Sequence, residues 1–204
     1  MGTAIAVPQL RLQLDAGMNV YNFLPDAVFV THCHADHSFR LTHFVSRTKP
    51  PRFYMPAAMI DMAELYLFSS QQLSAGIVFN KRDYEVNHVT VGVQPGECLT
   101  NFAKNKQLGA HIIGCHHRDI PCVGYAFYCK HKGLRPDLQG LSKQAIAQRA
   151  QLGEAVSVEV EVPLFIFLGD TTAAVFDPTL PHSALPFLQR GTFYADDCAV
   201  LLAV

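Results

Sequence analysis

The alternation of apolar and polar residues along the chain predicts many short strands. An opening strand or hairpin is expected over residues 3–14, where Leu10, Leu12 and Leu14 alternate with polar neighbours. Residues 26–31 form an apolar run with two valines, which is typical of a short buried strand. Further strands are expected over residues 52–55, 87–93, 111–115, 123–129, 156–162 and 164–168, with Pro163 separating the last two.

Helices are expected at three places between these strands. One begins over residues 39–44, and a longer one covers 56–72 with Pro56 in its first turn. The third covers residues 140–151, which are rich in Ser, Lys, Gln and Ala. This order of elements fits an α/β sandwich. We found no repeat or linker that would divide the chain, so residues 1–204 are expected to form a single domain.

Composition limits the class of protein. A chain of 204 residues that are 50% hydrophobic can bury a substantial core. No apolar run reaches the roughly 18 residues that cross a bilayer. Pro8 and Arg11 interrupt the early apolar residues, so we expect no signal peptide and an intracellular location in the cytoplasm, nucleus or an organelle. The six cysteines lack a Cys-x-x-Cys spacing and are expected to be reduced thiols.

Residues 31–37 carry the strongest chemical signal, with the sequence Thr-His-Cys-His-Ala-Asp-His. Alternate residues of an extended chain point to the same side, so His32 and His34 can face one metal ion. If the chain turns at Ala35, Asp36 and His37 can face a second. Imidazole and carboxylate groups are ligands that zinc takes, and two metals about 3.5–4 Å apart are used to hydrolyse phosphate esters. The segment therefore predicts a metal site rather than a chance cluster of surface histidines.

Two later segments offer further ligands. His116 and His117 follow an apolar run at residues 112–114. Asp170 follows the apolar residues 165–168 within Gly-Asp-Thr-Thr, and a carboxylate has two oxygens that can bridge two cations.

Together these segments resemble the metallo-β-lactamase-fold hydrolases, and among them the ribonuclease Z family, which trims the 3′ end of precursor tRNA. The resemblance rests on the His-x-His-x-Asp-His block, on Pro-Cys-Val-Gly-Tyr at residues 121–125, and on Gly-Asp-Thr-Thr at 169–172. Residues 8–17, which end in Asp-Ala-Gly, and residues 134–141 are also similar. The resemblance spans about Gln9 to Asp197 and implies an αββα sandwich that lacks the family's final C-terminal elements.

The resemblance also implies a zinc-dependent endoribonuclease with precursor tRNA as its partner and no membrane contact. Two zinc ions are expected per complete site, with manganese as an alternative. Asp36 is implied to help activate the attacking water, and Asp15 to fix a ligand by hydrogen bonds. Six residues are implied as ligands: His32, His34 and His117 for one ion, Asp36 and His37 for the other, and Asp170 between them.

The chain departs from the family pattern at three places. The spacing after His117 is one residue longer than usual, which leaves His116 as an alternative ligand. The family has Glu before a late Thr-Phe segment, where this chain has Arg190 and Gly191. The chain stops at Val204 without the family's later histidines, and His182 lies too early to replace them. The second metal is therefore expected to lack a ligand, which suits a fragment, a degenerate member, or a site that a partner such as a second copy in a homodimer completes.

The net charge of −1 gives the chain no general attraction for RNA, so RNA binding would depend on local basic patches. Two basic groups are either phosphate contacts or solvated surface. They are Arg40, Arg47, Lys49 and Arg52 after the histidine block, and Lys130, Lys132, Arg135, Lys143 and Arg149 later in the chain.

Three functions are consistent with the sequence. The leading expectation is a zinc-dependent phosphodiesterase acting on RNA. The second is a binding module or catalytically impaired relative, which the missing C-terminal histidines favour. The third is a metallo-hydrolase of the same fold acting on a thioester, lactone or small phosphodiester. The Gly-Tyr and Gly-Asp-Thr-Thr segments favour RNA, whereas the lack of a long basic, glycine-rich arm weighs against it.

Overall fold

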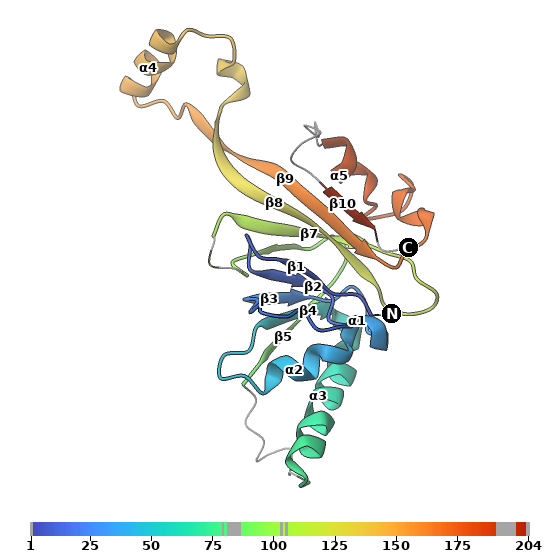
Figure 1. Ribbon diagram of the computed structural model, residues 1–204. Coiled ribbons are helices and arrows are strands. Elements are labelled where there is room, and N and C mark those ends of the chain that lie inside the picture. The colour runs from blue at the N-terminus through green and yellow to red at the C-terminus, as the bar shows by residue number, and fades with distance from the viewer. Residues whose placement is uncertain are drawn as a thin grey trace.

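Two mixed five-stranded sheets form the centre of the computed structural model, which describes residues 2–78, 80, 87–102, 104, 106–190 and 199–202 (Figure 1). The first sheet has the order β1 (Ile5–Val7), β2 (Leu12–Leu14), β3 (Ala27–Phe29), β4 (Arg52–Pro56) and β5 (Val89–Val93). The second has the order β10 (Ala199–Leu202), β9 (Ser157–Gly169), β8 (Val123–Leu134), β7 (Leu108–Gly114) and β6 (Cys98–Thr100).

Short helices join and cover the strands. The α-helices are α1 (Ala35–Ser38), α2 (Thr42–Val45), α3 (Ile60–Ala75), α4 (Lys143–Gln151) and α5 (Leu185–Arg190). The 3-10 helices are η1 (Phe39–Leu41), η2 (Ala57–Met59), η3 (Pro136–Leu138) and η4 (Ala173–Phe176). None of the helices among the described residues is long and apolar enough to cross a membrane.

The layers follow from the alternation of side chains along each strand. In β3, Ala27 and Phe29 pack in a core cluster shared by the two sheets, whereas Val28 packs with residues of α2 and α3. A third cluster joins the outer face of the second sheet to η4 and α5. Helices therefore cover both outer faces (Figure 1). This arrangement confirms the α/β sandwich expected from the sequence and agrees with the metallo-β-lactamase fold.

Aromatic rings tie the two sheets together beneath the histidine block. Phe29 stacks on Tyr54 at 4.8 Å and meets Tyr125 edge-on at 5.0 Å. The buried hydroxyl of Tyr125, from the second sheet, donates hydrogen bonds to the carbonyls of Val30 at 2.7 Å and Tyr54 at 3.3 Å, both in the first. Because Val30 directly precedes the histidine block, the hydrogen bond from Tyr125 holds the start of that block against the second sheet. Tyr125 is fully buried and cannot stack on a nucleobase.

The structure corrects several element boundaries. The opening segment is a hairpin of β1 and β2, as expected, whereas the helix expected over residues 39–44 is divided into η1 and α2 and is preceded by α1, which was not expected. Pro56 ends β4 instead of starting a helix, and α3 begins at Ile60. Strand β6 was not expected. Pro163 does not divide β9, because a register shift between Phe127 and Tyr128 of β8 accommodates it.

Strands β8 and β9 extend beyond the sheet as an arm, with η3 and α4 at its tip (Figure 1). Burial changes at Cys129 in β8 and at Leu164 in β9, beyond which the side chains are largely exposed. The sequence did not predict this arm, but the expected absence of a long basic, glycine-rich arm still holds for it, because its cations are largely paired. Ion pairs neutralise three of its five expected cations: Lys130 with Glu159, Arg135 with Asp137, and Arg149 with Glu154.

Candidate metal centre

The histidine block changes from extended chain to helix in its middle. Thr31 lies two residues beyond the end of β3, and its carbonyl accepts a backbone hydrogen bond from Val123 of β8 at 2.9 Å. His34 is still extended, with φ −61° and ψ 148°, and α1 begins at the next residue. The Ser38 hydroxyl donates to the carbonyl of His34 at 2.9 Å and closes this first turn. His32 and His34 therefore project from extended backbone, whereas Asp36 and His37 lie on α1 rather than in a loop.

Three imidazoles meet on one side of the block. His32 Nε2 lies 3.1 Å from His34 Nδ1, and the ring centroids of both lie 5.0 and 5.2 Å from that of His117. The possible ligand atoms of these three residues all lie within 4.8 Å of one another. His117 comes from the connection between β7 and β8. The neighbouring His116 is exposed and belongs to neither group of mutually close ligand atoms found among the described residues.

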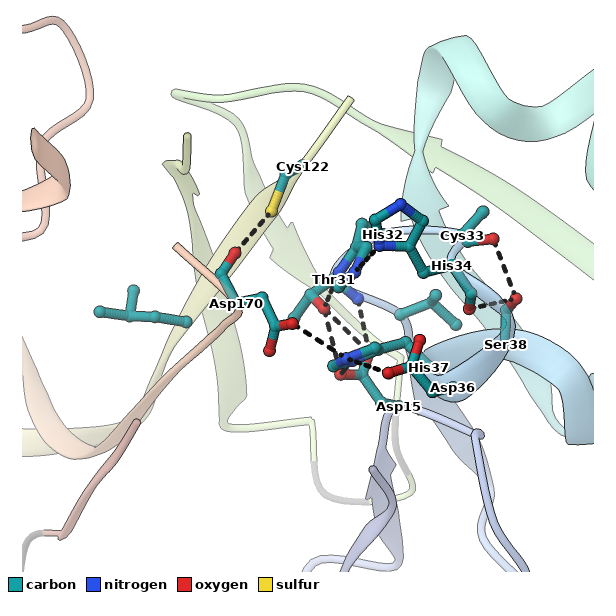
Figure 2. A network of polar contacts seen from close by, with 12 residues as sticks. Asp15, Thr31, His32, Cys33, His34, Asp36, His37, Ser38, Cys122 and Asp170 are labelled. Carbon is teal, nitrogen blue, oxygen red and sulfur yellow. Dashed lines mark hydrogen bonds and ion pairs between the residues drawn. The ribbon is translucent and has the colours of Figure 1, made fainter. Parts of the chain in front are cut away.

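A second group consists of His32, His37 and Asp170, again with ligand atoms within 4.8 Å of one another. His37 Nε2 lies 3.5 Å from Asp170 Oδ2 and 3.9 Å from Asp36 Oδ2. Figure 2 shows Asp170 and Asp36 beside the His37 ring. His32 thus belongs to both groups, which the sequence did not indicate. Asp36 is outside this second group, and its side chain is 53% exposed.

Asp15 supports the block from below (Figure 2). It is completely buried and accepts hydrogen bonds from the Thr31 backbone amide at 2.7 Å and the Thr31 hydroxyl at 3.1 Å. Its other oxygen lies 2.7 Å from His37 Nδ1. The expected role of Asp15 as a hydrogen-bonding support for a ligand is consistent with these contacts. Gly17 is required nearby, because a Cβ there would collide with the Asp36 carbonyl oxygen.

The contact between Asp15 and His37 joins two groups whose pKa values are both raised. Burial raises the pKa of Asp15, against the opposing effect of His37 and Thr31. Burial alone would lower the pKa of His37, but its hydrogen bond to Asp15 and the charges of Asp15, Asp170 and Asp36 together raise it. A proton on Nδ1, facing Asp15, leaves Nε2 directed at Asp170 and available as a ligand.

His32 is suited to bind metal in its neutral form. Burial, followed by the positive charge that His37, His34 and His117 can carry, lowers the pKa of His32 to about 3. The Thr31 hydroxyl donates to Asp15 and lies 3.0 Å from His32 Nδ1. The hydroxyl oxygen can therefore accept a hydrogen bond from Nδ1–H, so that Nε2 presents its lone pair. Neutral imidazoles beside a carboxylate are a donor set that fits zinc.

Thr31 is a functional residue that the sequence reasoning missed. Its contacts orient both Asp15 and His32, and it is completely buried. The signal available was a polar residue at the end of an otherwise apolar strand. A Cβ at Gly169, whose φ is +59°, would collide with the Thr31 side chain, which explains the glycine before Asp170.

The segment after Asp170 anchors the connection that carries His117. The His116 amide donates to the Thr171 hydroxyl at 3.0 Å, and the Thr172 amide donates to the His116 carbonyl at 2.9 Å. The thiol of Cys122 contacts the carbonyl of Asp170 at 3.5 Å. Two motifs that lie far apart in the sequence therefore hold one another in place.

The C-terminal departures are only partly visible. The segment 191–198 lies outside the described residues, as do Arg190's side chain and residues 203–204. His182 packs against Gly96, and its carbonyl accepts a hydrogen bond from Gly114 at 3.0 Å. Within the described part of the chain it does not join the ligand groups.

Comparison with known proteins agrees with the fold and the cluster. The pattern of the metallo-β-lactamase superfamily matches residues 24–102, which include the histidine block. The tRNase Z TRZ1 of Arabidopsis thaliana is 27% identical over 207 residues, covering 97% of this chain and 70% of that relative. The chain therefore resembles the ribonuclease Z proteins of the metallo-β-lactamase superfamily, and this resemblance supports a hydrolase. Members of that superfamily are typically metal-dependent.

Proposed function

We propose that this ribonuclease Z-like hydrolase is a zinc-dependent phosphodiesterase that cleaves RNA, with precursor tRNA as its substrate. The observation that carries the proposal is the pair of ligand groups that share His32. Paired metal sites are used for in-line displacement at phosphorus. Similarity to a tRNase Z over 97% of the chain supports RNA over other esters.

We assign the proposed ligands to two zinc ions. His32, His34 and His117 hold one zinc ion, and Asp36 and His37 hold the other, with Asp170 between them. The contact of 3.5 Å between His37 Nε2 and Asp170 Oδ2 supports this division, and so does the neutral state of His32. Among the proposed ligands, Asp36 has the least geometric support, because its exposed carboxylate lies beside the group of His32, His37 and Asp170 and not within it.

Side chains in and beside the histidine block orient the water and the metal ligands. A zinc pair supplies Lewis acidity that makes a water molecule more acidic and offsets the charge on the scissile phosphate. Asp36 orients the attacking water and accepts its proton, for which its exposed carboxylate has the required freedom. As the water oxygen bonds to phosphorus, the bond from phosphorus to the 3′ oxygen breaks, and that oxygen takes a proton from solvent. Asp15 keeps His37 in one orientation, and Thr31 does the same for His32.

Metal binding is expected to weaken as the pH falls. His37 must bind metal through Nε2, and protons compete for that nitrogen. Because the pKa of His37 is raised in the metal-free protein, this competition begins above the ordinary pKa of histidine, about 6.5. Zinc affinity should therefore rise with pH through the neutral range. Competition titration with a zinc chelator at several pH values measures this, and a pH-independent affinity between pH 6 and about 8 would contradict it.

The function itself is tested by measuring metal content and activity on one sample. Plasma mass spectrometry counts the bound zinc, and precursor tRNA, a lactone and a thioester are offered as substrates. Close to two zinc ions with cleavage of the tRNA precursor is the expected result. Hydrolysis of only the lactone or the thioester would indicate that the substrate is another ester and not RNA. Zinc binding below one ion per chain without turnover of any substrate would instead indicate a binding module.

A further inference from the structure

A basic pocket lies beside the metal centre but shares none of its proposed ligands. It has a volume of about 610 Å³ and lies between the loop of residues 18–24 and the helices η1 and α2. Three basic side chains line it, together with aromatic rings from both walls, and its lining includes no acidic residue. The residues that matter here are Arg40, His43, Arg47, Tyr21, Phe23 and Phe44.

The two arginines of this pocket carry charge that no carboxylate in the described part of the chain neutralises. Elsewhere Arg11, Arg135 and Arg149 form ion pairs, but within the described residues no ion pair joins Arg40 or Arg47 to an acid. The guanidinium of Arg47 lies 4.7 Å from the Phe44 ring centre, and that of Arg40 lies 5.5 Å from the Phe39 ring centre. Burial lowers the pKa of Arg47, so this cation is partly stripped of water. Such a guanidinium favours an anionic ligand.

The pocket begins one helical turn beyond the metal cluster. The Ala16 amide donates to the His37 carbonyl at 2.6 Å, and the Arg40 amide donates to the Ala16 carbonyl at 2.7 Å. From there η1 and α2 run back from the end of β3 towards the start of β4, so Arg47 lies farther from the cluster than Arg40. A chain molecule that crosses the cluster could therefore continue along this pocket.

Aromatic residues identify the class of chain that fits. Tyr21 is 82% exposed, and Phe23 lines the same wall. Proteins that hold single-stranded nucleic acid combine cations that follow the phosphates with aromatic rings on which bases stack. The net charge of −1 gives no general attraction for RNA, so a local cationic pocket has to supply it.

We propose that this pocket is a binding subsite for single-stranded RNA next to the scissile phosphate, in which Arg40 and Arg47 contact phosphates and Tyr21 stacks on a base. The identity of the ligand as substrate rests on the function proposed above. The subsite would position the RNA and take no part in the chemical step. It also gives a specific role to two members of the basic group that follows the histidine block.

Binding of an oligouridylate of about 12 nucleotides to the zinc-loaded protein tests the proposal by fluorescence anisotropy at several salt concentrations. The double variant Arg40→Ala, Arg47→Ala should bind at least about tenfold more weakly. Its slope of log affinity against log salt should fall by about 1.4, or 0.7 for each lost phosphate contact. Tyr21→Ala should weaken binding by about tenfold, and Tyr21→Phe should restore it, because only the ring is needed for stacking.

A matched control removes two positive charges elsewhere. Lys104 and Lys106 are exposed in the connection between β6 and β7 and belong to neither basic group. The variant Lys104→Ala, Lys106→Ala should keep the affinity of the unmodified protein. Equal losses in the two double variants, or an unchanged salt slope in the arginine variant, would overturn the subsite.

Hydrolysis of bis(p-nitrophenyl) phosphate separates this proposal from the proposed function. The small ester needs only the metal cluster, so Arg40→Ala, Arg47→Ala should hydrolyse it at the normal rate. If the unmodified protein hydrolyses neither the ester nor RNA, but oligouridylate binding still depends on the two arginines, the proposed function fails and the RNA subsite stands. Normal cleavage of precursor tRNA with full oligouridylate affinity in the arginine variant would remove the subsite and leave the function intact.

Discussion

His32→Ala should abolish the zinc site of His32, His34 and His117, weaken the neighbouring site, and reduce phosphodiester hydrolysis by at least about a thousandfold. His32 is the residue common to both groups of close ligand atoms, and no other described residue has that position. Loss of several kcal/mol of transition-state stabilisation, at about 1.4 kcal/mol for each factor of ten, accounts for a change of this size. Zinc content and kcat/KM for bis(p-nitrophenyl) phosphate measure it.

Two histidine variants serve as comparisons. His34 belongs to the first group only, so His34→Ala should retain about one zinc ion, held through the second group. His131 is exposed on the arm, and His131→Ala should change neither zinc content nor hydrolysis. Circular dichroism checks that each variant is folded. Normal turnover in folded His32→Ala protein would refute the metal mechanism.

Asp15→Ala should lower the free energy of unfolding by about 3–5 kcal/mol. The substitution removes a buried acceptor from the Thr31 amide, the Thr31 hydroxyl and His37 Nδ1 at once. Each group left without a partner loses hydration without compensation, and a protonated His37 would lose the buried carboxylate at Nδ1 and keep only Asp170 and Asp36 near Nε2. Urea unfolding of the metal-free protein, with a chelator present, measures the effect without a contribution from zinc binding.

Asp15→Asn and Asp26→Ala are the controls for this variant. The amide keeps an oxygen for Thr31 but cannot balance charge on His37, so Asp15→Asn should unfold at an intermediate free energy and bind zinc about 10–100-fold more weakly. Asp26 forms an exposed ion pair with Arg11 at 2.8 Å, and Asp26→Ala should cost no more than about 1 kcal/mol. A loss for Asp15→Ala as small as that for Asp26→Ala would contradict the support role of Asp15.

Much of the local architecture could be predicted because it depends on short-range pattern. The apolar run before the block predicts β3, and alternation predicts that His32 and His34 face one side, as the distance of 3.1 Å between their nitrogens bears out. The preference for His117 over His116 came from comparison with a motif, and the structure brings the ring of His117 to the cluster. The ligand roles of these residues remain predictions.

Other features depended on contacts that no window of sequence contains. The arm of β8 and β9 could not be predicted because its strands are held by pairing with each other, as far as Leu134 with Ser157. This pairing continues beyond Cys129, where the pattern of buried apolar residues has already ended. The pocket of Arg40 and Arg47 forms only where the 18–24 loop crosses the helices.

By itself, the sequence determined which chemical groups this protein offers and which of them are neighbours along a strand, because side-chain alternation is a property of local backbone geometry. Only the tertiary structure decided that His32 belongs to both ligand groups, that Asp15 contacts His37, and that Thr31 contacts both Asp15 and His32. Asp15, the histidine block, His117 and Asp170 come from four separate segments, and their distances depend on how two sheets pack face to face. That packing is set by the buried rings of both sheets together, so it cannot be inferred from any one segment.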